Sequence, residues 1–114
     1  GFAQQKISDQ LKKGLKQVLK SEASRIVIAY EPVWAIGTGN TATEIEAQDM
    51  HSFIRLTTRN LLGEAAAELR IVYGGSVKTT NAASLLSETD INGLLVGGAS
   101  LEAKTFSEIV NAEC

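Results

Sequence analysis

An acidic residue, Glu31, stands between an apolar run and a loop that is rich in apolar residues and glycine. The loop sequence is YEPVWAIGTG, residues 30–39, and the run before it is RIVIAY. A carboxylate costs free energy wherever water is excluded, so this side chain either turns out to solvent or is retained for chemistry. Motifs elsewhere in the chain have to decide between these two interpretations.

Three glycine-bearing segments have the composition of an anion site. Gly37 lies in the loop after Glu31, while Gly74 to Ser76 and the pair Gly97 and Gly98 each follow a later apolar run. Backbone amides without side chains, backed by the start of a helix, favour negative charge. Each segment alone is a weak signal, because a tight turn between strand and helix is the commoner reason for such glycines. None matches a P-loop or a dinucleotide-binding motif, so we predict a small phosphate ester as the ligand.

The first half of the chain is predicted to form a helix, a strand and a second helix. Apolar residues recur at helical spacing from Ile7 to Lys20. Arg25 to Tyr30 is rich in β-branched residues and does not alternate with polar ones, which predicts a strand covered on both faces. Thr43 and Glu46 have the spacing of a capping box, so a helix should begin there and continue until Gly63 stops it.

The second half repeats the pattern of strand, glycine turn and helix twice. Apolar runs end at glycine pairs, and each pair leads into a segment with helical periodicity. The predicted elements are a strand from Leu69 to Tyr73, a short helical segment around Asn81 to Leu86, a strand from Gly93 to Val96, and a last helix with Leu101, Phe106, Ile109 and Val110 on its apolar side.

This order of elements implies an α/β fold with parallel strands joined by right-handed crossovers. Ligands bind such folds at the carboxyl ends of the strands, where Glu31 and the three glycine segments are all predicted to lie. Three strands covered on both faces would leave two sheet edges unpaired. We therefore predict that residues 1–114 are part of a larger fold and comprise about three strand-loop-helix units preceded by a helix.

Composition excludes several classes of function. Eleven Lys and Arg against thirteen Asp and Glu give a net charge of -2, so the chain has no basic field for nucleic acid or an anionic membrane. No apolar run is long enough to span a bilayer, and the start of the sequence lacks the apolar core of a signal peptide. We expect a cytosolic protein whose partners are small molecules or other proteins.

The single histidine and the single cysteine, His51 and Cys114, indicate neither a metal site nor a disulfide. His51 lies in a predicted helix without a carboxylate or cysteine at an obvious ligand spacing. We interpret it as a surface residue of the helix in preference to a catalytic one. Cys114 is interpreted as a solvated thiol.

Three motifs, AYEPVWAIGTG, YGGSV and LVGGASL, together resemble triosephosphate isomerases. The similarity runs through almost all of Ala29 to Val110 and corresponds to the carboxyl-terminal part of that family's TIM (β/α)8 barrel. It implies an enzyme of glycolysis and gluconeogenesis that needs no metal or cofactor, is cytoplasmic, and is a homodimer at full length. The implied reaction interconverts dihydroxyacetone phosphate and glyceraldehyde 3-phosphate through an enediolate.

The resemblance implies that Glu31 is the catalytic base. A Glu works best as a base when apolar neighbours desolvate it and bring its pKa toward the operating pH. We predict that those neighbours are Ile36 and Leu95. The resemblance also implies that Arg55 pairs with Asp90, the alternative being two separate solvated charges.

The resemblance further implies a mobile lid over residues 32–42 and a phosphate site made by backbone amides. Tyr73 and Ser76 would hold the closed lid near Ala42 and Gly39, although Tyr73 could equally be a core residue with a solvated hydroxyl. At Asn40, in the exit hinge, the family often has Lys, and this affects closure more than chemistry. The implied phosphate ligands are Gly37, Ser76, Gly97 and Gly98, and the implied lid residues are Pro32, Val33, Trp34, Ala35, Ile36, Thr38 and Gly39.

Two catalytic positions of the family have no counterpart in this sequence. The family uses a lysine and a histidine from earlier barrel strands to stabilise the enediolate, and Lys12, Lys13 and His51 do not lie in the matching motifs. Because electrophilic stabilisation is commonly the largest catalytic term, we expect the isolated chain to be inactive. Two alternatives stay open, namely a non-catalytic half-barrel module that binds phosphate or docks a partner through its open strand edges, and a phosphate-binding barrel enzyme of another reaction type.

Overall fold

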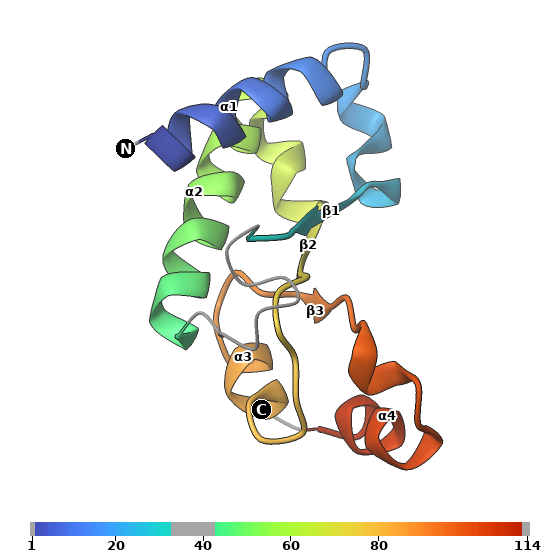
Figure 1. The fold of residues 1–114 in the computed structure, drawn as a ribbon. Helices are drawn as coiled ribbons and strands as arrows, with labels where there is room; N and C mark the ends of the chain where they lie inside the picture. The colour runs from blue at the N-terminus through green and yellow to red at the C-terminus, as the bar shows by residue number, and fades with distance from the viewer. Residues whose placement is uncertain (1, 33–42, 113–114) are drawn as a thin grey trace.

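A three-stranded parallel sheet lies at the centre of the computed structural model, which describes residues 2–32 and 43–112 (Figure 1). The strands are β1 (Val27–Tyr30), β2 (Arg70–Tyr73) and β3 (Gly93–Leu94), in the order β1-β2-β3. Both pairs are parallel. The predicted α/β fold with parallel strands is therefore confirmed, although β3 is two residues shorter than the predicted strand.

Helices connect the strands and lie toward both ends of the molecule. In Figure 1, α1 lies at one end of the sheet and α3 and α4 lie at the other, while α2 runs along one side from the α1 end toward α3. The α-helices are α1 (Phe2–Gly14), α2 (Glu44–Leu62), α3 (Ala82–Leu86) and α4 (Ala103–Val110), and the 3-10 helices are η1 (Lys20–Arg25), η3 (Gly63–Glu68) and η4 (Gly98–Ser100). Within the described ranges, no helix is long and apolar enough to cross a membrane.

The longest helix, α2, begins and ends as its sequence predicts. Thr43 Oγ1 accepts a hydrogen bond from the backbone amide of Glu46, and the Glu46 carboxylate accepts one from the amide of Thr43, both at 3.1 Å. These two bonds satisfy amides that the first turn leaves free. Gly63 ends the helix with a φ of 70°, which a residue with a Cβ resists.

Two hydrophobic clusters fill the interior, and both include residues of β2 and α2. The first brings β1 and β2 together with α1 and α2 and includes Ile54 and Ile71. The second lies toward α3 and α4 and includes Leu85 and Ile109. Tyr30, the last residue of β1, packs against both clusters, so it links the two halves of the core.

The first helix and the first strand differ from their predictions. α1 ends at Gly14, and a 3-10 helix occupies the end of the interval before β1, so the prediction of one helix to Lys20 is wrong. The prediction that β1 is covered on both faces is also wrong, because Val27 is 58% exposed and Ala29 is exposed as well. The apolar composition of a strand shows that it can be buried, but it does not show which part of the protein covers it.

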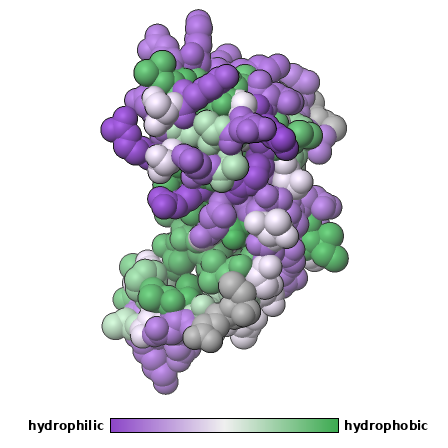
Figure 2. All heavy atoms as spheres, turned by 180° about the vertical axis from the view of Figure 1, so that it is seen from behind, coloured by the Kyte–Doolittle hydropathy of each residue, from purple (hydrophilic) through white to green (hydrophobic). Residues whose placement is uncertain are grey.

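The last helix buries less than its pattern predicts. Of its predicted apolar side only Ile109 is buried, while Leu101 is 86% exposed and Val110 is also open to solvent. Seen from behind, hydrophobic side chains gather across the middle of the molecule, between the polar upper part and the lower lobe (Figure 2). Exposed apolar surface of this kind is typical of faces that contact further polypeptide.

Candidate functional site

The parallel register brings Glu31, Gly74 and Leu95 into one row at the carboxyl ends of the strands. Tyr30 pairs with Tyr73 across β1 and β2, and Tyr73 pairs in turn with the last residue of β3. The ladder continues one step further, because Gly74 N donates to Tyr30 O at 2.8 Å and Leu95 N donates to Tyr73 O at 2.9 Å. The three residues that follow the strands are thereby fixed side by side.

Gly74 is the point at which this row is packed most closely. A Cβ at this position would lie 2.7 Å from Glu31 Cγ and 3.5 Å from Leu95 Cδ2. The stem of Glu31 and the side chain of Leu95 thus both reach the space above Gly74. Glu31 itself is exposed and Leu95 is 47% exposed, so the described residues do not enclose the carboxylate in the apolar setting that we predicted. The other predicted neighbour, Ile36, lies outside the described residues.

Replacing Gly74 with Ala should misplace Glu31 while leaving the fold largely intact. The added methyl group would displace the exposed Glu31 side chain, and it would lie 3.3 Å from the backbone oxygen of Tyr30, so some stability is lost as the backbone adjusts. A carboxylate that moves by about 1 Å can lose about 10²-fold in rate. Steady-state kinetics of an active barrel that contains this chain should show a lower kcat for Gly74→Ala. Gly14→Ala is the matched control, since a Cβ there meets nothing within 4 Å among the described residues.

The loop that carries Ser76 is held from both sides. Asn81, at the start of α3, accepts a hydrogen bond from Lys78 N at 2.7 Å and donates one to Ser76 O at 3.0 Å. A Cβ at Gly75 would overlap the phenol of Tyr73, which is fully buried in the core. The alternative of Tyr73 as a core residue with a solvated hydroxyl is therefore wrong in its second part, because the hydroxyl oxygen is buried too.

Of the other predicted phosphate ligands, Gly97 and Gly98 are exposed, and Gly37 lies outside the described residues. A Cβ at Gly97 or Gly98 would meet no atom of the described residues within 4 Å, so packing there does not demand glycine and the backbone is accessible to a ligand. Gly37, the lid residues 33–42 and the exit hinge at Asn40 lie outside the described residues. Pro32, the first lid residue, is described and is buried.

A groove of about 580 Å³ is lined by residues of α1 and β1, together with Glu31, Pro32 and Ile54 of α2. Its walls come from the apolar face of α1 and from β1, with Lys6 and Gln10 as polar residues. Gly97 and Gly98, the described glycines among the predicted phosphate ligands, do not line this groove. The structure therefore places Glu31 beside Gly74 and Leu95, and also on the wall of this groove.

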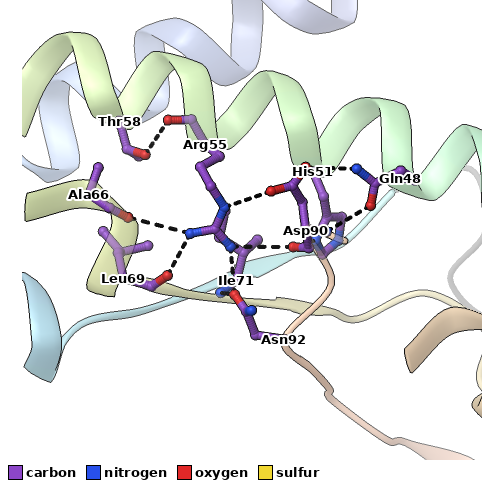
Figure 3. A network of polar contacts seen from close by, with 9 residues as sticks. All are labelled: Gln48, His51, Arg55, Thr58, Ala66, Leu69, Ile71, Asp90 and Asn92. Atoms are coloured by element: carbon purple, nitrogen blue, oxygen red, sulfur yellow. Dashed lines mark hydrogen bonds and ion pairs between the residues drawn. The ribbon is translucent and has the colours of Figure 1, made fainter. Parts of the chain in front are cut away.

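A polar network centred on Arg55 ties α2 to the segment before β3 (Figure 3). Arg55 Nε donates to Asp90 Oδ1 at 2.9 Å, so the two side chains that the resemblance paired form an ion pair. The rest of the guanidinium donates to Leu69 O at 2.8 Å and to Asn92 Oδ1 at 2.6 Å. Gln48 exchanges two hydrogen bonds with Asp90, at 2.7 and 2.9 Å. The network fixes the approach to β3, and Gln48 and Asn92 were not predicted.

His51 is fully buried, so its interpretation as a surface residue is wrong. On α2 it occupies the same stripe as Ala47, Ile54 and Thr58, all of them buried. The spacings of four, three and four residues along this stripe were a signal for burial in the sequence. Burial is the main reason why the pKa of His51 lies below its usual value, and the nearby charge of Arg55 lowers it further, while the Asp90 carbonyl acts in the opposite direction.

Parallel strands, helical crossovers and a carboxylate at the carboxyl ends of the strands define an α/β protein of the kind that includes the β/α barrels. Residues 1–113 match the family described as "Triosephosphate isomerase". The chain belongs to the triosephosphate isomerase family.

Curated relatives carry the same name and are about twice as long as this chain. The triosephosphate isomerase of Moorella thermoacetica is 51% identical over 111 residues, which are 97% of this chain and 45% of the relative. That of Chloroherpeton thalassium is 50% identical over 113 residues, with 98% and 45% coverage. That of Pelobacter propionicus is 53% identical over 106 residues, with 92% and 42% coverage. The chain therefore spans less than half the length of these relatives.

Proposed function

We propose that this chain supplies the proton-transferring carboxylate and part of the phosphate site of a triosephosphate isomerase. The observation that carries the proposal is the row of Glu31, Gly74 and Leu95 at the carboxyl ends of neighbouring parallel strands. This edge is where β/α barrels bind their substrates. Membership of the family supports the choice of a phosphorylated three-carbon substrate.

In the proposed reaction, Glu31 moves one proton between adjacent carbons. The carboxylate takes a proton from C1 of dihydroxyacetone phosphate, which breaks the C–H bond and leaves an enediolate. Return of a proton to C2, with transfer of a proton between the two oxygens, gives glyceraldehyde 3-phosphate, so atoms and charge balance.

Amides at Gly37, Ser76, Gly97 and Gly98 bind the phosphate. Residues 32–42 close over it, and Tyr73 and Ser76 hold the closed lid. Desolvation of Glu31 in the closed state comes from Ile36 and Leu95.

The isolated chain lacks the groups that stabilise the enediolate, so in this proposal it is inactive by itself. The family's lysine and histidine would come from the remaining length of the barrel, which this chain does not contain. The exposed faces of β1 and α4 would be covered by that same polypeptide. The complete protein would be a cytoplasmic homodimer without metal or cofactor, and this chain alone would associate through its open strand edges.

Joining the chain to the rest of a relative tests this function. We define the completed barrel as a fusion of this chain with the part of the Moorella thermoacetica enzyme that it does not match. The completed barrel should isomerise glyceraldehyde 3-phosphate, whereas the chain alone should show no turnover above buffer. Phosphate binding by the chain together with an inactive, folded completed barrel would favour the alternative, a non-catalytic module that binds phosphate or docks a partner.

A further inference from the structure

His51 lies in a cluster of three rings that adjoins the proposed base. Its ring centroid is 5.9 Å from that of Tyr30, edge to face at 85°, and 6.1 Å from that of Tyr73, while the two tyrosine rings are 6.5 Å apart. Tyr30 directly precedes Glu31, and Tyr73 directly precedes Gly74. The two backbone segments that fix the row at the strand ends are therefore anchored by side chains that contact one imidazole.

The contacts of the imidazole define its protonation. His51 Nδ1 lies 3.1 Å from the carbonyl oxygen of Asp90, and because a carbonyl only accepts, Nδ1 carries the proton. Nε2 is buried and has no hydrogen-bond partner among the described residues. In the neutral ring this nitrogen holds a lone pair and needs no acceptor. Protonation would create a buried N–H donor and a charge in an apolar setting, which is costly.

We propose that His51 is a positioning residue for Glu31, and that it acts through Tyr30. The imidazole belongs to α2, and its hydrogen bond to the Asp90 carbonyl links it to the segment before β3. In its neutral form it holds the Tyr30 ring through the edge-to-face contact. Edge-to-face ring pairs are favourable beyond the area that they bury, so this contact favours one orientation of the Tyr30 ring. A fixed Tyr30 fixes the direction in which the next residue, Glu31, leaves the sheet. This role rests on the proposed function, because it concerns the proposed base.

The groups around His51 make its neutral form sensitive to acid. Arg55 on α2 and Asp90 before β3 carry opposite charges beside it, and Tyr30 on β1 and Tyr73 on β2 face it with neutral rings. The pKa of His51 in the folded chain lies below the usual 6.5, chiefly through burial. The unfolded chain therefore binds the proton more readily, so the contribution of His51 to stability is complete above about pH 6.5 and is lost as the pH falls toward the folded pKa.

Nuclear magnetic resonance of the chain itself tests the coupling without any activity. The sequence has one histidine and two tyrosines, all three in this cluster, so selective labelling of each type gives signals without overlap from other sites. On acidification both tyrosine ring signals should shift with the same midpoint as His51, below pH 6.5. In His51→Phe these shifts should vanish between about pH 5 and 7, since no other side chain of the sequence ordinarily titrates there. Tyrosine ring signals that stay unchanged while His51 titrates would overturn the proposal.

Kinetics of the completed barrel test the effect on the base. His51→Asn keeps an N–H donor for the Asp90 carbonyl but removes the ring, whereas His51→Phe keeps a ring and removes the donor. We expect kcat to fall about tenfold in His51→Asn with KM nearly unchanged, and by less than about threefold in His51→Phe. A role in stability alone would leave kcat of the folded protein unchanged in both variants.

The outcomes separate this inference from the proposed function. A His51→Asn barrel that turns over at the unmodified rate, in a background where Glu31→Gln abolishes activity, overturns the positioning role and leaves the function standing. A Glu31→Gln barrel as active as the unmodified one overturns the proposed function, and the positioning role falls with it. Should His51→Asn fail to fold, the comparison of His51→Phe with the unmodified chain in the tyrosine titration still decides the coupling.

Discussion

Replacing Glu31 with Gln in the completed barrel is expected to lower kcat by about 10²- to 10⁴-fold, the range that a general base contributes. The amide keeps the size of the side chain and its place beside Gly74, but it has no basic oxygen to accept a proton from carbon. KM should stay within about threefold, because the phosphate contacts are made by other residues. Steady-state rates of glyceraldehyde 3-phosphate isomerisation measure both constants.

The control for this substitution is Glu68→Gln. Glu68 is exposed at the end of η3, and its replacement removes the same charge from the protein. Glu68→Gln should leave both constants unchanged. An unaltered kcat in Glu31→Gln would end the assignment of this residue as the base. A raised KM at constant kcat would instead assign Glu31 to substrate binding.

Local chemistry made several features of the fold predictable from sequence. The capping box of Thr43 and Glu46 and the stop at Gly63 depend only on residues within one turn, and both are present. The parallel order follows from alternating strands and helices, whose short connections leave few topologies. Membership of the family then extends these local elements to part of a barrel.

His51 shows where residue type misled the prediction. A single histidine among polar neighbours is commonly a surface residue, yet the helical stripe that runs from Ala47 through Ile54 includes it. The imidazole can be buried because its two nitrogens have different needs, one donor satisfied by a carbonyl and one lone pair that tolerates an apolar setting. Periodicity was the better guide here than polarity.

Long-range polar contacts could not be predicted from local pattern. Gln48 and Asp90 are 42 residues apart, and their two hydrogen bonds depend on the register between β2 and β3. Asn92 was missed for the same reason, since its side-chain oxygen accepts from both Arg55 and the amide of Ile71. Only the resemblance to the family suggested that Arg55 and Asp90 belong together.

Replacing Arg55 with Met is expected to destabilise the chain strongly. The substitution keeps much of the apolar stem but leaves the Asp90 carboxylate and the Leu69 carbonyl without their charged donor (Figure 3). Both members of the ion pair are mostly buried, at 21% and 17% side-chain exposure. Removing one partner of a buried pair costs about 3–5 kcal/mol, which is a large part of the stability of a small domain. Urea unfolding followed by circular dichroism measures the loss.

Arg59 provides the matched control, because it lies one turn later on α2 and is exposed. Arg59→Met removes the same charge and should change the unfolding free energy by less than about 0.5 kcal/mol, as surface substitutions usually do. Arg55→Lys should fall between the two, since lysine keeps the charge near Asp90 but lacks the planar fork that reaches Leu69 and Asn92 together. The prediction can still be tested if Arg55→Met does not fold, because the unfolding free energy of Arg55→Lys can then be compared with that of Arg59→Met. Equal losses at positions 55 and 59 would mean that the network adds nothing beyond a surface charge, and that the approach to β3 is fixed by packing alone.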